Sequence, residues 1–383
     1  MPAPAACKGK NVQIEVTTKG SVRPGLKHGV HLAVLDGWRG LSILFVLAAH
    51  LLPLGTKAWQ VNYSTGILGM VIFFNLSGFL ITSFLLKEQN IPSFLIRRFS
   101  RVLPLAWLYL AITLVISDAP LYTWVTHFLF YANMPPKDLL PLTDHMWSLC
   151  VEMQFYIGVA ILVALLRGRG LLLLPVLCLF FTGLRMWEGV YASSVSYYRI
   201  DEILAGCVLA LAYHGKLGDW LRRIMQILPQ WPLFLLLVLS CVPQARWLNY
   251  CRPYLAALLI GSTILNSGTS MVRILGLKYF LSLAGISYSL YVIHPILTDT
   301  WLGSGDIYHK YEKRPLFFIV LFILAYISTH YYESRFIAWG RHLAGKFGGG
   351  RQPAAKPQLV NLAAGEQESE RDRNSIDVLT PGE

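Results

Sequence analysis

Long apolar runs alternate with short polar connections along most of the chain. A helix needs about 20 mostly apolar residues to cross a bilayer, so each long run is a candidate membrane span. The runs cover residues 33–53, 66–86, 102–118, 147–166, 171–188, 200–214, 231–243, 253–269, 282–301 and 315–338; the third, sixth and seventh are short. The pattern predicts an all-α polytopic integral membrane protein with about ten transmembrane helices in one bundle.

The composition agrees with membrane insertion. Of 383 residues, 55% are hydrophobic and 14% are charged, whereas a soluble domain carries about 25% charged residues. The net charge of +12 is spread over short connections, which argues against a nucleic-acid-binding module. The six cysteines lack the spacing of a metal site, and none is predicted. Cys241 and Cys251 flank one short loop and would pair only if that loop faced an oxidising compartment.

The distribution of Lys and Arg predicts the orientation, because cytoplasmic connections are enriched in these residues. The segments "KEQNIPSFLIRRFSR", "RGRG", "HGKLGDWLRR" and "MVRILGLK" are basic, whereas 119–146 and 189–198 are nearly free of Lys and Arg. One outer loop, "HKYEKR" at 309–314, contradicts the rule. We expect cytoplasmic tails at 1–32 and 341–383, the second disordered, around a membrane domain at 33–340.

Ionisable residues inside the spans are functional candidates. Arg39 and His50 lie eleven residues apart, which is about 16 Å along a helix and within roughly 20° of the same face. Asp36 precedes Arg39 by three residues and is close enough to pair with it. Glu152 lies just inside the outer end of its span, at a depth similar to that of His50.

Structural alternatives exist for these charged residues. Arg98 and Arg101, beside Arg97, are also typical positive-inside anchors. Glu152 is equally suited to pair with an arginine of another helix, and His50 to a hydrogen-bonded position at the membrane interface.

Three further candidates have structural alternatives of their own. His294 precedes Pro295 and can donate to carbonyls that the proline leaves free. Asp201 lies at a predicted helix N-terminus, where a carboxylate suits the helix dipole. Trp147 is also typical of an interfacial aromatic belt.

Six blocks in order resemble the membrane acyltransferase-3 family, whose characterised members O-acylate sugars on cell-surface polysaccharides, lipopolysaccharide and Nod factors. The blocks are "LDGWRG" with His50, "FFNLSGFLIT" at 73–82, "FLIRRFSRVLP" at 94–104, "HMWSLCVEMQFY" at 145–156, "RIDEILAG" at 199–206 and "GISYSLYVIHPI" at 285–296. Together they cover residues 35 to about 335, and the ordered set is specific although each block alone is weak.

The chain departs from the family pattern at three positions. Val71 stands where the family commonly has Asp, and Met153 where a second Glu often follows Glu152. After Glu333 the usual Pro is absent, and Arg335 stands in its place. The central Arg, His and Glu positions of the family are present.

The resemblance implies acyl transfer, with acetyl-CoA as the donor substrate and no permanently bound cofactor. Arg98 and Arg101 would bind the donor phosphates, because Arg matches phosphate oxygens bidentately. Arg39 would hold the pyrophosphate or the extended arm, and His50 would be the general base or an acylated nucleophile; we favour direct transfer. Glu152 would orient the imidazole or contact the acceptor.

The implied acceptor is a sugar hydroxyl of a cell-surface or lipid-linked glycan, at the bacterial inner membrane. Residues expected to contact substrate or support the site are Asp36, Trp147, Ser148, Asp201 and His294. The alternatives are a proton-coupled transporter and a catalytically inactive assembly partner. The sequence leaves the acyl length and the oligomeric state open.

Overall fold

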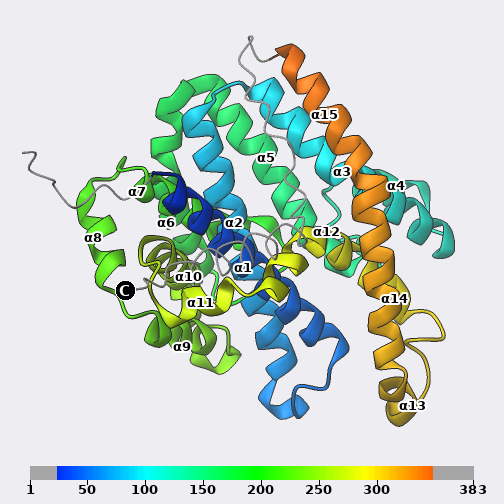
Figure 1. The fold of residues 1–383 in the computed structure, drawn as a ribbon. Helices are drawn as coiled ribbons and strands as arrows, with labels where there is room; N and C mark the ends of the chain where they lie inside the picture. Colours follow the sequence, from blue (N-terminus) through cyan, green and yellow to red (C-terminus); the bar gives the residue numbers. More distant parts are fainter. Residues whose placement is uncertain (1–23, 348–383) are drawn as a thin grey trace, which may run out of the picture.

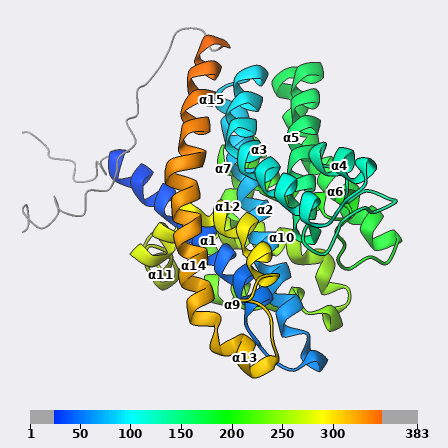
Figure 2. The same cartoon turned by 90° about the vertical axis from the view of Figure 1, so that its right-hand side faces the viewer.

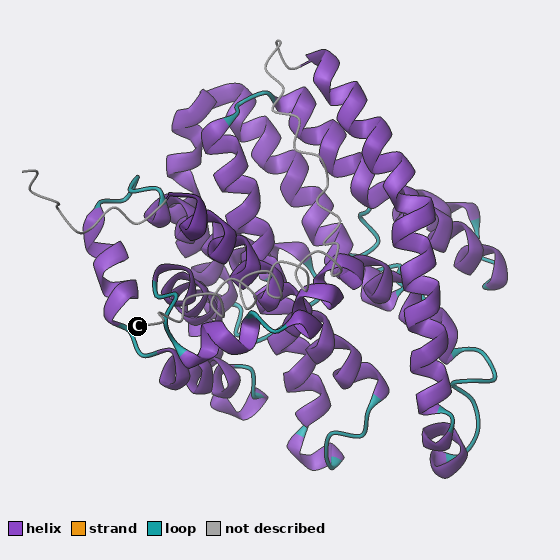
Figure 3. Ribbon diagram, in the orientation of Figure 1, coloured by secondary structure: helices purple, strands orange, loops and turns teal. Residues whose placement is uncertain are grey.

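The computed structural model describes residues 24–347, and every regular element in that range is a helix (Figure 3). The α-helices are α1 (Pro24–Leu51), α2 (Val61–Lys87), α3 (Ile91–Ile116), α4 (Leu121–Phe128), α5 (Trp147–Leu166), α6 (Leu174–Trp187), α7 (Ile200–Tyr213), α8 (Asp219–Ile227), α9 (Gln230–Ser240), α10 (Leu248–Leu265), α11 (Ser270–Leu275), α12 (Lys278–Thr298), α13 (Ile307–Glu312), α14 (Arg314–Ile327) and α15 (Ser334–Phe347). The all-α prediction is confirmed.

The number of membrane spans differs from the prediction. Each of the ten predicted runs falls on a helix, but only six stretches of the described chain are long and apolar enough to qualify, or seven if the bent pair α8 and α9 is one span. The qualifying stretches are Ala33–Leu51, Val61–Lys87, Ile91–Ile116, Asp144–Trp187, Lys278–Thr298 and Arg314–Phe347. Helices α6, α7 and α9 have 14, 14 and 11 residues, short of the usual span. Ten spans in one bundle are therefore not confirmed.

Helix α3 starts well before the predicted run at 102–118. Asn90 caps it by accepting a hydrogen bond from the Ser93 N–H at 2.9 Å, and Pro92 occupies the first turn, where its missing N–H costs nothing. The basic segment that the charge pattern assigned to a connection is thus helical. This places Arg98 and Arg101 in the early turns of α3 rather than in a loop.

The centre of the molecule is built on α2, which packs against α1 on one side and α7 on the other (Figures 1 and 2). The contact with α7 depends on two glycines. A Cβ at Gly78 would lie 1.9 Å from the carbonyl oxygen of Ile203, and one at Gly206 would lie 2.0 Å from that of Asn75. Small residues permit such close helix packing. Helix α12 covers another face of α1.

The three departures from the family pattern have simple structural settings. Val71 and Met153 are buried among apolar side chains. At Arg335 the chain keeps the backbone N–H that a proline would remove, and the helix continues from α14 through the π-helical turn η6 (Ser328–Glu333) into α15. Glu333 in that turn accepts hydrogen bonds from the hydroxyls of Ser289 and Ser328.

The predicted tails lie mostly outside the described residues. Helix α1 begins at Pro24 and α15 ends at Phe347, so both helices extend beyond the predicted domain limits of 33 and 340. Cys241 is buried, Cys251 is half-buried, and both are free thiols in the structure.

Candidate active site

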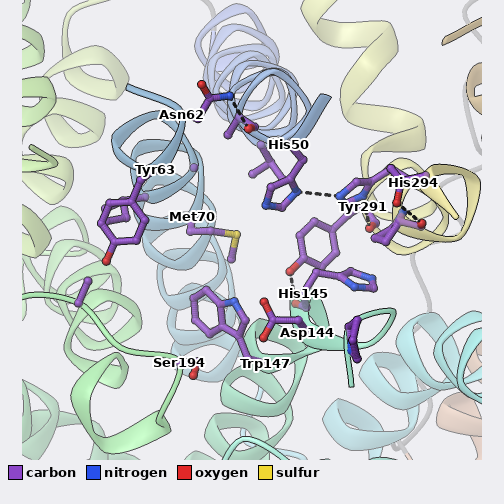
Figure 4. Close-up of a pocket in the computed structure, with 18 of the residues that line it drawn as sticks. His50, Asn62, Tyr63, Met70, Asp144, His145, Trp147, Ser194, Tyr291 and His294 are labelled. Carbon is purple, nitrogen blue, oxygen red and sulfur yellow. Dashed lines mark hydrogen bonds between the residues drawn. The ribbon is translucent and has the colours of Figure 1, made fainter. Parts of the chain in front are cut away.

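A cavity of about 710 Å³ opens where the end of α1 meets α2, α12 and the start of α5 (Figure 4). Its lining includes His50, Asn62, Tyr63, Met70, Asp144, His145, Trp147, Ser194, Arg199, Tyr291, His294, Lys310 and Arg314. Both predicted site histidines, His50 and His294, therefore line one cavity, together with Trp147.

His50 and His294 are directly hydrogen-bonded, and the geometry assigns their protons. His294 Nδ1 lies 2.7 Å from the carbonyl oxygen of Tyr291 and 3.3 Å from that of Leu290. Carbonyl oxygens only accept, so this nitrogen carries the proton and Nε2 of neutral His294 is an acceptor. His50 Nδ1, 2.8 Å from that Nε2, therefore donates. Nε2 of neutral His50 is left with a lone pair, on an exposed ring that lines the cavity.

Pro295 explains why His294 is held in this way. Proline has no N–H, so the helical carbonyl of Tyr291, four residues earlier, has lost its backbone donor. His294 Nδ1 replaces that donor. The structural alternative for His294, bonding to a carbonyl that proline leaves free, is thus what the structure shows, and the same bond fixes the tautomer that faces His50.

The backbone around His50 is fixed by Asn62 of α2, which sequence analysis did not single out. The Asn62 amide donates to the carbonyls of Ala49 at 2.7 Å and Leu52 at 2.6 Å, and its oxygen accepts from the Leu54 N–H at 3.2 Å. These bonds satisfy carbonyls at the C-terminal end of α1 that have no helical partner. His50 thus projects from a helix end whose backbone is fixed by the hydrogen bonds of Asn62.

His145 is a second residue that sequence analysis passed over, although it begins the block "HMWSLCVEMQFY". It is buried, and neither ring nitrogen has a hydrogen bond of good geometry in the described structure, although the backbone of Val292 lies close to the ring. The rings of Tyr109, Tyr291 and His294 surround it, with centroids 5.3, 5.4 and 5.5 Å away. A buried imidazole without a well-formed hydrogen bond is costly, so His145 is a candidate for contact with a bound molecule.

Trp147 and Ser148 take different positions at the start of α5. Trp147 lines the cavity and carries the Arg199 guanidinium over its ring at 5.0 Å. Ser148 is buried, and its hydroxyl lies 2.6 Å from that of Tyr291. The Tyr291 hydroxyl also donates to the carbonyl of His145. Ser148 therefore ties α5 to α12 beside the two histidines.

Glu152 lies with the arginines and not with His50. Its carboxylate accepts hydrogen bonds from the hydroxyls of Ser77 at 2.9 Å and Tyr156 at 2.6 Å. Arg98 lies over the Tyr156 ring at 6.0 Å. The acidic group within electrostatic range of His50 is Asp144.

The three predicted donor-binding arginines come together in the structure. Arg39 interacts electrostatically with Arg98, Arg101 and Glu152, and its guanidinium pairs with Asp36 at 3.3 Å, as the sequence predicted. We call Arg39, Arg98 and Arg101 the arginine cluster. It is joined by Glu152, the group that sequence analysis had placed beside the histidine.

A narrow second cavity of about 30 Å³ lies along α1 between Arg39 and His50. Ser42, whose hydroxyl donates to the Arg39 carbonyl, lines it. Val46, Met70 and Tyr291 line both cavities, which makes the two neighbours. The other residues that line the narrow cavity are Ile43, Phe73, Ser148, Leu149, Ser287 and Tyr288.

Asp201 lies away from the cavity, in a buried group of ion pairs. Its carboxylate pairs with Arg185 at 3.1 Å and accepts from the Thr182 hydroxyl at 3.2 Å. Next to it, Glu202 pairs with Arg199 at 3.1 Å and with Arg252 at 3.0 Å. The role of Asp201 seen here is to connect α6 with α7.

The fold and the site define a class of protein. It is a helical protein with several stretches long and apolar enough to span a membrane, a histidine-lined cavity at the end of α1, and an arginine cluster formed by α1 and α3. The acyltransferase domain family matches residues 32–329, and the chain belongs to this family. No solved structure matches the chain. Within the described residues, no group of three or more His, Cys, Asp or Glu side chains is placed to hold a metal ion.

The chain is similar to several O-acetyltransferases. It is 27% identical to a predicted peptidoglycan O-acetyltransferase of Bacillus subtilis, over 80% of this chain and 55% of that protein. It is 26% identical to the peptidoglycan O-acetyltransferase OatA of Listeria monocytogenes, over 78% of this chain and 55% of that protein. A predicted O-acetyltransferase of Staphylococcus aureus is 35% identical over 32% of this chain and 23% of that protein. The chain thus spans about half the length of the first two relatives. These matches support the predicted classes of multi-pass membrane protein and O-acyltransferase.

Proposed function

We propose that the protein transfers an acyl group, most simply acetyl, from acyl-CoA to a sugar hydroxyl of a cell-surface or lipid-linked glycan. The observation that carries the proposal is the orientation of His50. Its Nδ1 is held by His294, and its Nε2 is presented to the larger cavity as a lone pair. An imidazole with a free ring nitrogen that can take the proton of a hydroxyl is the arrangement that general-base acyl transfer to an alcohol requires.

The donor site is proposed at the arginine cluster. The phosphates of CoA carry several negative charges, and arginine binds phosphate oxygens through paired N–H groups. From Arg39 to His50 the helix rises about 16 Å, a length suited to the extended pantetheine arm. The narrow cavity beside Ser42 lies along this path. At about 30 Å³ this cavity is too small for the arm, so binding would need the surrounding side chains to move apart.

The proposed reaction is a direct transfer. His50 Nε2 takes the proton of the acceptor hydroxyl while that oxygen attacks the thioester carbonyl carbon. The carbon–sulfur bond then breaks, and the CoA thiolate leaves and takes the proton from His50. His294 acts through His50 as a positioning residue. The Glu152 contacts support a role in ordering the arginine cluster, in place of the predicted contact with the imidazole.

The acceptor and the orientation also belong to the proposal. The peptidoglycan O-acetyltransferases among the relatives favour a cell-wall glycan as acceptor. We place the chain in a bacterial inner membrane with cytoplasmic termini, so that the arginine cluster faces cytoplasmic CoA. Ten spans remain part of this proposal. The chain turns at η3 (Arg167–Leu173) between α5 and α6 (Figure 1), where Arg167 has a left-handed φ of 54°, so that α5 and α6 would cross separately; α7, the bent pair α8 and α9, and α10 would supply the other crossings beyond the qualifying stretches.

The test uses inverted membrane vesicles, radiolabelled acetyl-CoA and a total glycan extract. Wild-type protein should transfer label to glycan, and His50→Ala should not, although it inserts and folds normally. His330→Ala is the matched control, since the His330 ring is exposed and lies outside the cavity lining, where it hydrogen-bonds the Tyr326 carbonyl and stacks on the Tyr326 ring.

Equal label with wild type and His50→Ala would remove His50 from the mechanism. Absence of label with both proteins would contradict acyl transfer and favour the transporter or the inactive partner.

A further inference from the structure

Two cations line the larger cavity without an acidic partner. Arg314, at the start of α14, is buried, and its Nε and Nη1 atoms have no hydrogen-bond partner in the described structure. Its guanidinium lies over the rings of Phe317 at 4.9 Å and Tyr311 at 5.6 Å. Lys310 is half-buried and has neither an ion pair nor a side-chain hydrogen bond among the described residues.

The remaining charges of the cavity leave this pair unbalanced. Arg199 also lines the cavity, but Glu202 neutralises it at 3.1 Å. Asp144 is the one acid among the described lining residues, and it lies within electrostatic range of His50. Lys310 and Arg314 therefore give the cavity a positive side with no built-in counter-charge.

The neighbouring residues show that this arrangement is specific. Asp306 caps α13 by accepting from the backbone and ring N–H groups of His309, and these bonds lower the pKa of the Asp306 carboxyl. Lys313 is used locally, donating to the carbonyls of Trp301 at 2.6 Å and Ser304 at 2.8 Å. The loop is thus held by Asp306 and Lys313, which leaves Lys310 available to the cavity.

The segment "HKYEKR" is also the connection whose charge contradicts the positive-inside rule. A topological role therefore does not account for its cations. A buried guanidinium with unpaired N–H groups is costly, and a bound anion would supply the missing acceptors.

We infer that Lys310 and Arg314 form a subsite for an anionic group of the acceptor, a carboxylate or a phosphate, while the acceptor hydroxyl reaches His50. The inference rests on the proposed function and narrows its substrate to acidic or phosphorylated glycans. A phospholipid headgroup would offer the same chemistry, so the experiment separates the two sources.

The experiment measures binding to the full chain in a neutral detergent, by tryptophan fluorescence, with Trp147→Phe used to assign the signal to the cavity. Two probe pairs are compared: methyl N-acetylmuramic acid with its neutral methyl ester, and N-acetylglucosamine 1-phosphate with methyl N-acetylglucosamine. For at least one pair, the anionic probe should bind wild type tenfold or more tightly than its neutral partner. Lys310→Gln should reduce this preference, and Lys310→Glu should abolish it.

Arg314→Lys tests the buried site without removing its charge and should weaken the preference by losing paired N–H contacts. Arg246→Gln is the matched control, because Arg246 is an exposed arginine outside the cavity lining; it should bind as wild type does. Equal binding of anionic and neutral probes in both pairs would overturn the inference. So would loss of the preference in phosphatidylglycerol nanodiscs but not in phosphatidylcholine nanodiscs, since a lipid headgroup would then occupy the subsite.

Binding of the probes needs no turnover. A preserved charge preference without acetyl transfer would contradict the proposed function alone. Transfer to neutral and anionic acceptors with equal efficiency would contradict the subsite alone.

Discussion

Two regions of the molecule bury charged or titratable side chains, and the regions differ in whether each buried charge has a partner of opposite charge. Where α6, α7 and α10 meet, each arginine has an acid: Arg185 with Asp201, and Arg199 and Arg252 with Glu202. Some guanidinium nitrogens of these arginines also lack a hydrogen bond, but each of the three arginines has a carboxylate within 3.1 Å. At the larger cavity, by contrast, the buried Arg314 has no acidic partner among the described residues. Buried charges with a counter-charge stabilise a particular packing, whereas a buried cation without an acid indicates that its counter-charge comes from outside the chain.

The sharpest test of this comparison is His50→Ala. We expect acetyl transfer to fall by about 10²- to 10⁴-fold, the usual contribution of a positioned general base. The thermal unfolding midpoint in detergent should fall only slightly, because the ring is exposed to the cavity and the His50→Ala change removes a single hydrogen bond, the one to His294. Initial rates at saturating acetyl-CoA provide the measurement. A large loss of folded protein would instead show that His50 has a structural role.

The opposite result is expected for Glu202→Gln in the paired region. Removing one partner of a buried ion group costs about 3–5 kcal/mol, because the remaining charges lose their compensation. Folded yield and unfolding midpoint should both fall sharply. Glu202→Met combined with Arg252→Met should recover part of the loss, since it removes a buried charge of each sign. Equal instability of the single and double variants would show that the charges are not the cause.

The two regions also differ in how well sequence predicts them. Apolar runs located all the main helices, and the i, i+3 pairing of Asp36 with Arg39 followed from helical spacing. Glu152 was placed with His50 on depth alone. Depth does not specify which face of a helix a residue occupies relative to its neighbours, and the Tyr156 and Ser77 hydroxyls hold Glu152 on the arginine side.

The histidine pair shows a second limit. His50 and His294 are 244 residues apart in sequence, and no local pattern predicts their contact. The proline after His294 did predict its bond to a free carbonyl, and that bond determines the tautomer facing His50. Asn62 and His145 carry no such local signal beyond their position near the ends of apolar runs, so their roles emerge only from packing.

His294→Phe should separate positioning from catalysis. It removes the acceptor of His50 Nδ1, and the loss of a buried hydrogen bond costs about 1–3 kcal/mol. We expect kcat to fall by about 10- to 100-fold with little change in the KM for acetyl-CoA. His294→Gln offers a carbonyl oxygen to Nδ1 and should restore part of the rate. A purely structural residue would show no such rescue, and the unfolding midpoint of both variants checks for that case.

The smallest expected effect extends the comparison to the arginine cluster, where Arg98 has contacts of both kinds. It lies over the ring of Tyr156, whose hydroxyl donates to Glu152, as a structural arginine would. It is also grouped with Arg39 and Arg101, as a residue of a phosphate site would be. If it binds donor phosphate, Arg98→Ala should raise the KM for acetyl-CoA about tenfold, the effect of losing one charge-assisted hydrogen bond, and leave kcat nearly unchanged.

Arg97→Ala is the control for that experiment, because Arg97 is the exposed neighbour on the same helix and carries the same charge. Its KM should change by less than about twofold, since an exposed charge contributes little. A lower kcat or unfolding midpoint in Arg98→Ala at unchanged KM would class Arg98 with the paired arginines of α6, α7 and α10. The arginine cluster would then have a structural role in helix packing, and the donor phosphates would have to be bound elsewhere along α1.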